Sequence, residues 1–353
     1  VFSETTFTND RQKAEVIVTK QDKDTENPLN GGIFGIYAAS DITNVDGTVV
    51  AKKGTLIEKA TTGTDGKAKF SADLPLGFSY EVKEEQAPTG YVRNTEDVYQ
   101  FAFLYTNDKE AKLTFKHTFK NERVTAKISL QKQDKETKKA VPQGDATLEK
   151  AVYGLYACED IVHPDGATGV IYKAGEQVAT LTTDKNGKAS VDGLYLGNYY
   201  VKEITPPTGY LADEEEHDLV CNYEGDLVAE VKRDCLSLEQ VMKQPFEIIK
   251  AANNGKTDAD LLKGAGFTAY LVSSLKVNED GSYDFDSAKP VVSGENGATE
   301  IFTDEKGYAC SIPLPFGSYI VRETTTPHNY KPVDDFEVNI TENHPNEPQI
   351  WRV

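Results

Sequence analysis

The chain has 353 residues, which is too long for one small hydrophobic core and suits two or three domains of ordinary size. Its formal net charge of −19, from 57 acidic and 38 basic residues, argues against the phosphate backbone of a nucleic acid as a partner. The 18 Tyr and 15 Phe beside a single Met, with many Thr and Val, favour strands over helices. No apolar run approaches the roughly 18 residues of a membrane helix, and the first residues do not resemble a signal peptide.

Metal and redox patterns are absent from the sequence. We expect all four cysteines to be unpaired thiols, because their spacing fits no metal site: Cys158, Cys221, Cys235 and Cys310. The acidic residues Asp280, Asp284 and Asp286 are an alternative calcium site, but they lack a regular loop spacing, and a solvated insertion is the preferred interpretation. The sequence therefore predicts no metal and no cofactor.

One pattern recurs three times along the chain. Each repeat opens with a strand whose last inward-facing position is a lysine, at Lys20, Lys132 and Lys250. An aromatic strand, a polar insertion and an Asp-Gly or Asn-Gly hairpin turn follow in each repeat. The lysines lie about 112 and 118 residues apart, which is the size of a single sandwich domain. Several short strands with turns between them predict an antiparallel β-sandwich for each repeat.

A second strand of each repeat carries a glutamate on its apolar face. An aromatic residue, a Val and a Glu stand at positions i, i+2 and i+4, so all three point to the same side of the strand. These glutamates are Glu84, Glu203 and Glu323. A buried carboxylate is costly without a partner, so each of them requires one inside its domain.

The closing strand of the first repeat supplies a possible partner. Phe115, His117 and Phe119 alternate with polar residues, and the same alternation places Asn121 among buried neighbours. The spacing of about 11 residues from this Asn to the next repeat's lysine also separates Asn9 from Lys20. We therefore interpret Asn9 as the acceptor residue of a preceding repeat and the chain as a piece of a longer array.

This division gives four segments. They are the end strand of a preceding repeat at 1–10 and three domains at 11–122, 123–239 and 240–353, the last with a closing strand that is possibly incomplete. The joints between the domains contain no long flexible linker, which predicts limited bending between them.

The Lys-x-Asp opening, the Asp-Gly hairpin after Thr64, the Val-Lys-Glu-x-x-x-Pro-x-Gly-Tyr segment and the terminal Asn resemble the collagen-adhesin B-type repeats. This family includes the prealbumin-like domains of Gram-positive pilins and surface adhesins. The resemblance covers essentially the whole chain, three times over. It implies an all-β fold of three tandem, immunoglobulin-like or prealbumin-like Greek-key sandwiches. It also implies a spontaneous isopeptide bond in each domain, between the first-strand Lys and a last-strand Asn or Asp, promoted by the Glu.

The residues give a physical reason for this chemistry in the first domain. A lysine desolvated among Val16, Val18 and Phe119 loses its ammonium proton more readily, so a free amine becomes available as a nucleophile. Burial favours the neutral form of a glutamate, which can then donate a proton to a carboxamide oxygen. We therefore expect Lys20 and Asn121 to form the bond with Glu84 as the promoting acid. The alternative is a buried, hydrogen-bonded polar cluster without a bond.

The second domain matches the pattern less well. Lys132 and Glu203 correspond to the first domain, but counting back 11 residues from the third lysine reaches Glu239 instead of an Asn. Asp234 is the candidate acceptor, because two leucines would share its face of the strand. The alternative is a domain without a crosslink.

In the third domain Lys250 and Glu323 correspond to the pattern, but the closing strand reaches the end of the sequence. If Trp351 and Val353 face inward, the acceptor is expected about two residues later, outside this chain. We therefore expect no isopeptide bond for Lys250 within these residues.

The leading functional hypothesis is a structural stalk segment of a Gram-positive adhesin or pilin, anchored to the cell wall and located outside the cell. Its partners would be the neighbouring repeats, and any attachment to wall or membrane would use segments outside this sequence. The alternative is an adhesin module that binds a host surface protein or glycan through the insertions at 40–60, 158–180 and 273–300. The candidate contacts there are Tyr172, Tyr283 and Phe285. An enzyme is the third hypothesis, and the sequence favours only single-turnover self-crosslinking.

Overall fold

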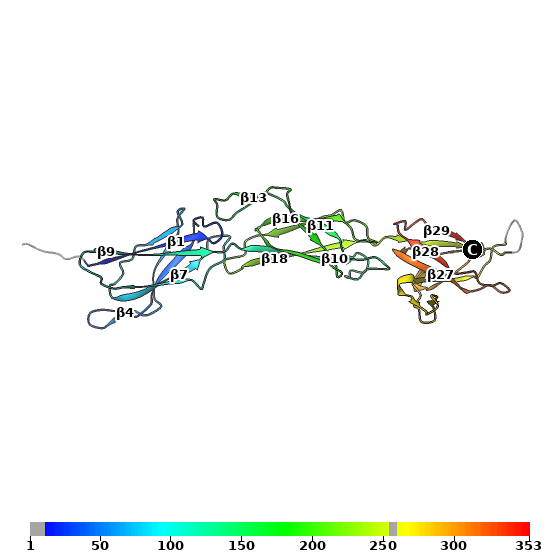
Figure 1. Cartoon of the computed structure of the whole chain (residues 1–353), viewed down its shortest axis with the longest axis horizontal. Helices are drawn as coiled ribbons and strands as arrows, with labels where there is room; N and C mark the ends of the chain where they lie inside the picture. The colour runs from blue at the N-terminus through cyan, green and yellow to red at the C-terminus, as the bar shows by residue number, and fades with distance from the viewer. Residues whose placement is uncertain (1–10, 254–259) are drawn as a thin grey trace, which may run out of the picture.

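The computed structural model describes residues 11–253 and 260–353, and these residues form β-strands joined by turns, with two short 3-10 helices. Three units follow one another along an elongated molecule, from β1 at the blue end to β29 at the red end (Figure 1). The predicted all-β fold of tandem sandwiches is confirmed. Asn9 lies outside the described residues. Among the described residues, no helix is long and apolar enough to cross a membrane.

The first unit has a three-stranded sheet, in the order β6-β1-β9, and a four-stranded sheet, in the order β5-β2-β7-β8. A small hairpin of β3 and β4 projects from it. The strands are β1 (Lys13–Asp22), β2 (Ile33–Ala38), β3 (Ile42–Thr43), β4 (Val49–Ala51), β5 (Leu56–Thr61), β6 (Lys67–Phe70), β7 (Phe78–Gln86), β8 (Val98–Phe103) and β9 (Lys112–Asn121).

The second unit repeats this arrangement, with sheets β15-β10-β18 and β14-β11-β16-β17. Its strands are β10 (Thr125–Asp134), β11 (Val152–Ala157), β12 (Ile161–Val162), β13 (Val170–Tyr172), β14 (Gln177–Thr182), β15 (Lys188–Leu194), β16 (Gly197–Thr205), β17 (Glu216–Cys221) and β18 (Glu230–Glu239).

The third unit has the equivalent sheets β25-β20-β29 and β24-β21-β27-β28. The 3-10 helices η1 (Val272–Ser274) and η2 (Glu295–Gly297) lie in its insertion. Its strands are β19 (Lys243–Gln244), β20 (Phe246–Ile249), β21 (Gly266–Leu271), β22 (Lys276–Val277), β23 (Tyr283–Asp284), β24 (Glu300–Phe302), β25 (Tyr308–Cys310), β26 (Leu314–Pro315), β27 (Gly317–Thr325), β28 (Phe336–Ile340) and β29 (Gln349–Arg352).

In each unit the first strand of the three-stranded sheet and the last strand of the unit lie side by side and run in the same direction. β1 pairs with β9, β10 with β18 and β20 with β29, all in parallel, inside sheets that are otherwise antiparallel. In β1 and β10 fully buried side chains alternate with partly buried ones, as the period of two in a strand requires. Each unit has its own apolar core between its two sheets. The parallel pairing therefore brings the two ends of each unit together along one edge of its core.

Short joints and direct contacts connect consecutive units. Residues 122–124 alone separate β9 from β10. Within this joint, the guanidinium of Arg123 lies 3.9 Å from the ring centroid of Tyr195 and so holds the joint against the second unit. Asn27 of the first unit donates a 2.9 Å hydrogen bond to the Asp165 carboxylate of the second. These contacts support the predicted limited bending between the first two units.

The predicted state of the cysteines is confirmed, since all four are free thiols. Cys221 and Cys235 are buried in the second core, whereas Cys158 and Cys310 are exposed. Packing between the sheets, with no disulfide, therefore holds each unit together.

Candidate functional site: buried lysine clusters

Three buried polar side chains meet in the core of the first unit. Lys20 from β1, Glu84 from β7 and Asn121 from β9 approach one another from three strands. The Lys20 Nζ lies 2.8 Å from Glu84 Oε1 and also contacts Asn121 Oδ1. Asn121 Nδ2 donates a 2.8 Å hydrogen bond to the same Glu84 Oε1. The structure thus brings together the three residues that the sequence selected for this domain.

Apolar side chains close this cluster to water. The side chains of Lys20 and Glu84 are both 0% exposed. The aromatic rings of Phe34 and Phe119 flank the Lys20 Nζ, which lies 5.7 and 6.0 Å from their centroids. Burial lowers the pKa of Lys20 below its ordinary value, although the charge of Glu84 acts in the opposite direction. The environment therefore favours a neutral amine more than water does.

The hairpin glycine of each repeat fixes the backbone of the lysine. The amide of Lys20 donates a 2.7 Å hydrogen bond to the carbonyl of Gly66, and the equivalent bonds of Lys132 and Lys250 end at Gly187 and Gly307. Gly66 has a φ of +71°, and a Cβ there would lie 2.7 Å from the Lys20 carbonyl oxygen. A side chain at this position would both strain the turn and displace the lysine strand.

A backbone amide ten residues later orients each glutamate. Asn94 donates its amide to Glu84 Oε2, Asp213 to Glu203 Oε2 and Val333 to Glu323 Oε2, at 2.7 to 2.8 Å. This leaves the other carboxylate oxygen of Glu84 and of Glu203 directed at the lysine. The sequence analysis missed these amides, because a backbone donor leaves no signature in residue type.

The Lys-x-Asp and Gly-Tyr motifs form a second polar link beside the cluster. The hydroxyl of Tyr91 donates a 2.7 Å hydrogen bond to Asp22, and Tyr210 makes the same bond to Asp134 at 3.0 Å. Each of these hydrogen bonds joins the end of the strand that carries the lysine to the loop that follows the strand with the glutamate. The third unit has Ala252 at the corresponding position and lacks this link.

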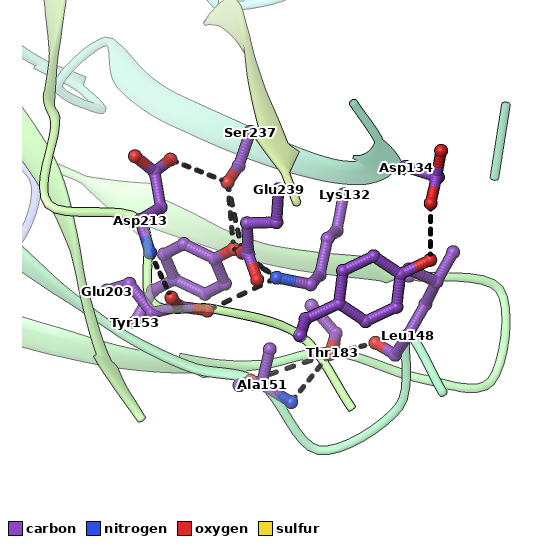
Figure 2. A network of polar contacts seen from close by, with 12 residues as sticks. Lys132, Asp134, Leu148, Ala151, Tyr153, Thr183, Glu203, Asp213, Ser237 and Glu239 are labelled. Carbon is purple, nitrogen blue, oxygen red and sulfur yellow. Dashed lines mark hydrogen bonds and ion pairs between the residues drawn. The ribbon is translucent and has the colours of Figure 1, made fainter. Parts of the chain in front are cut away.

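In the second unit, Glu239 meets Lys132. The Lys132 Nζ contacts Glu239 Oε1 and lies 3.2 Å from Glu203 Oε1, with all three side chains almost fully buried (Figure 2). Burial lowers the pKa of Lys132 to about 8, against the opposing charge of Glu203. The hydroxyl of Tyr153 accepts a hydrogen bond from Lys132 and donates one of 2.6 Å to Glu239 Oε1.

The expectation for Asp234 requires a correction. Asp234 is exposed on the outer face of β18, paired with Ser129, and the structure does not bring it to Lys132. Successive residues of a strand point to opposite faces, and Asp234 is an odd number of positions from the buried Glu239. Leu236, which suggested an inward face, is 49% exposed.

In the third unit the lysine and glutamate meet, and no third residue of the part that the structure describes takes the place of Asn121. The Lys250 Nζ lies 2.8 Å from Glu323 Oε2, and Glu323 Oε1 has no hydrogen-bond partner among the described residues. Asp22 pairs with Asn121 in the first unit, and Ile249 pairs with Arg352 in the third. Ala252 corresponds to Asp22, because each lies two residues after its lysine. If the register of Ile249 with Arg352 continues, the residue opposite Ala252 is two positions after Val353, where the sequence analysis expected the acceptor.

The insertions show no exposed aromatic cluster that would favour host binding. Tyr172, Tyr283 and Phe285 are all half-buried. Phe285 packs against its own unit, edge-on to Tyr270 and under the guanidinium of Arg322 at 4.0 Å.

The acidic residues of the third insertion bind neighbouring serines. Asp280 accepts hydrogen bonds from Ser282, and Asp284 accepts them from Ser287. These contacts are those of a solvated insertion closed by its own turns, and they use carboxylate oxygens that a cation would need.

One group of potential metal ligands lies between the first two units. Oxygen or nitrogen atoms of Asp22, His163 and Asp165 lie within 4.8 Å of one another. Their ligand atoms already have protein partners, since Tyr91 donates to Asp22 and Asn27 donates to Asp165. We interpret the group as a hydrogen-bonded contact between units.

Comparisons with known proteins identify the family to which the three units belong. The family model described as the SpaA prealbumin-like fold domain matches residues 14–122, 126–234 and 245–350. The chain belongs to this family. The resemblance to prealbumin-like repeats of Gram-positive surface proteins that the sequence indicated is therefore confirmed.

Individual relatives share sequence or fold with parts of the chain. The collagen adhesin of Staphylococcus aureus is 30% identical over 216 residues, which are 57% of this chain and 16% of the length of that protein. The Bacillus anthracis TIE protein has the same fold over 97% of this chain and 50% of its own, with a TM-score of 0.56 and 23% identity. BcpA, the major pilin subunit of Bacillus cereus, aligns over 97% of this chain with a TM-score of 0.35 and 16% identity.

Proposed function

We propose that this chain is a load-bearing stalk segment of a Gram-positive cell-surface adhesin or pilin, with domains at 11–122, 123–239 and 240–353. An isopeptide bond between Lys20 and Asn121, promoted by Glu84, closes the first domain. The observation that carries this proposal is the convergence of these three side chains, fully buried, between the first and last strands of the unit.

The geometry supports a proton shuttle through one oxygen. Glu84 Oε1 lies 2.8 Å from both the attacking Lys20 Nζ and the departing Asn121 Nδ2. Transfer of the ammonium proton to Glu84 leaves a neutral amine beside the carboxamide, and Nζ attacks Cγ. Glu84 returns this proton to Nδ2, and ammonia leaves. Glu84 then takes the second proton that Nζ loses, so that an amide joins Nζ to Cγ beside a neutral Glu84. The sequence suggested protonation of the carboxamide oxygen instead, but Oδ1 faces Lys20 while Nδ2 faces Glu84.

The fold promotes a single crosslinking reaction by holding its two reacting groups in place. The strands hold amine and carboxamide in contact, so a bimolecular collision becomes a fixed encounter. The bond forms once in each molecule and is therefore a maturation step of a structural protein.

The position of the bond gives it a mechanical role. Pulling force enters the first unit through β1 and leaves through the end of β9, and these strands are parallel neighbours. The bond joins β1 directly to the last residue of β9, so force passes from Lys20 to Asn121. The strands that lie between β1 and β9 in the sequence, including β7 and β8, then carry none of the pulling force.

The relatives support the same function at a coarser level. The chain is similar to part of a collagen adhesin, and the model of the prealbumin-like fold domain covers most of this chain. Attachment to a cell wall would use segments that this sequence does not contain. The neighbouring repeats are the partners that the elongated arrangement supports (Figure 1).

Peptide mapping by mass spectrometry tests the bond. Digestion of the full chain is expected to give a branched peptide that contains Lys20 and Asn121 and is lighter than its two parts by about 17 Da, the mass of ammonia lost in the covalent step. Lys20→Ala is expected to abolish this peptide. Lys13→Ala, which removes an exposed lysine of the same strand, is the matched control and should retain it. Two separate, unmodified peptides from the unsubstituted chain would refute the proposal.

A further inference from the structure

The second unit builds its lysine cluster from different residues at equivalent positions. On neighbouring strands of the four-stranded sheets, Glu84 is opposite Phe34 and Glu203 is opposite Tyr153. Tyr153 therefore occupies the position that Phe34 has in the first unit. The register of the parallel strands gives two further equivalences. Lys20 is opposite Phe119 and Lys132 is opposite Ser237, while Asp22 is opposite Asn121 and Asp134 is opposite Glu239.

These three differences compensate one another in volume and polarity. In the first unit the rings of Phe34 and Phe119 pack 4.7 Å apart above the lysine. In the second unit Ser237 replaces the larger Phe119. The space that the Phe119 ring fills in the first unit is therefore available to the longer side chain of Glu239 and to the hydroxyl of Tyr153. The second cluster is therefore a coherent alternative arrangement.

Hydrogen bonds hold Glu239 in one orientation. Tyr153 donates to Oε1 at 2.6 Å, and Ser237 donates a 2.8 Å hydrogen bond to Asp213 on the side away from the lysine (Figure 2). Glu239 Oε2 is buried and has no hydrogen-bond partner among the described residues. One oxygen of the carboxyl group is thus held by a donor, while the other is unbound.

We propose that Glu239 is the acceptor of an isopeptide bond to Lys132, formed by condensation of the two side chains with loss of water. The proposal extends the crosslinking of the first domain to a glutamate, which the sequence analysis passed over in favour of Asp234. Transfer of one proton within the Lys132–Glu239 ion pair gives a neutral amine facing a neutral acid. Nζ then attacks Cδ, and the carbonyl oxygen Oε1 accepts the Tyr153 hydrogen bond as its charge develops.

The atoms balance without an added reagent. The hydroxyl that contains Oε2 leaves with a second hydrogen from Nζ, and Glu203, 3.2 Å from Nζ, passes this hydrogen to it. The ammonium and carboxylate together thus become one amide and one water molecule. Burial favours this outcome, since the reaction replaces two charges in an apolar core by a neutral amide.

The distinction between an ammonia-releasing and a water-releasing bond makes the proposal testable independently of the first domain. In the full chain, a branched peptide containing residues 132 and 239 is expected to be lighter than its parts by about 18 Da, the mass of water. The Lys20 peptide reports the first bond separately, so either result can fail while the other holds. Asp234→Asn is the matched control and is expected to keep the branch between residues 132 and 239, with only the mass change of about 1 Da that the substitution itself causes.

Glu239→Gln gives a second readout that keeps the fold. A glutamine acceptor loses ammonia instead of water, so the mature Glu239→Gln chain is expected to have the same mass as the mature unsubstituted chain. Without the bond the two chains differ by about 1 Da, the difference between the amide and acid groups. A branched peptide joined at Asp234, or unmodified peptides containing Lys132 and Glu239 from a folded chain, would overturn the proposal.

Discussion

Replacing Glu84 by Gln removes the proton shuttle of the first domain and changes the shape of the site little. Glu84→Gln is therefore expected to leave Lys20 and Asn121 unlinked, while the core around them stays intact. The two residues are separated by 101 positions, so the bond closes a loop of about that length. By analogy with a disulfide, restriction of the unfolded chain over such a loop contributes about 4.7 kcal/mol to the free energy of unfolding.

This loss corresponds to a large change in melting temperature. A domain of roughly 110 residues has an unfolding entropy of about 0.23 kcal/mol/K, so the melting temperature is expected to fall by about 20 °C. The unlinked variant also has a buried Lys20 amine without a carboxylate partner, and this adds to the fall.

Calorimetry of the full chain, with the intact mass of the same sample, is the assay. One transition is expected to move to lower temperature. The mass is expected to lie about 16 Da above that of the linked, unsubstituted chain, because the retained ammonia adds about 17 Da and the change from Glu to Gln removes about 1 Da. Glu81→Gln on the same strand is the control. It affects an ion pair with Lys83 and a hydrogen bond from Gln100, and it should cost no more than about 1 kcal/mol. A Glu84→Gln chain that still carries the bond, or whose transitions do not move, contradicts the shuttle.

Three further predictions concern other parts of the chain. Asn121→Asp is expected to form the same bond with release of water, giving a mature mass identical to that of the unsubstituted chain, and a heavier product would contradict this. Lys250 is expected to stay unmodified in this chain, so peptide mapping should recover it with its free amine. Asp165→Ala is expected to loosen the contact between the first two units, seen as a broader distance distribution in small-angle scattering. Hydrogen bonds from Asn27 and Thr168 hold the pKa of Asp165 below its ordinary value, although burial alone would raise it. The contact is therefore expected to be complete above about pH 4 and to weaken as the pH falls further, and a scattering profile that is unaltered at low pH would contradict this.

Strand alternation made much of the first site predictable from the sequence. Lys20, Glu84 and Asn121 each continue an apolar alternation of period two, so their inward direction follows from their neighbours. Their convergence also needed the recurrence of the pattern, which indicated that opening and closing strands belong to one domain. The parallel pairing of β1 with β9 was not predicted, since a pairing between strands about 100 residues apart leaves no local signal.

The second site shows where residue type misled the prediction. The spacing of about 11 residues reached Glu239, the residue that the structure places at Lys132. It was set aside because the pattern demanded Asn or Asp, and apolar neighbours then favoured Asp234. The parity of the strand decides against Asp234, because Cys235, Ser237 and Glu239 all face inward. The roles of Tyr153 and Ser237 depend on packing across three strands, which the sequence of one strand does not contain.

The mass of the intact, folded chain at sub-dalton accuracy tests the central claim most directly. Closure of the first domain predicts a mass about 17 Da below that calculated from the sequence, and closure of the second lowers it by about 18 Da more, from the leaving groups of the two covalent steps. A mass equal to that of the unmodified sequence would contradict both bonds and, with them, the covalent path for force through the stalk.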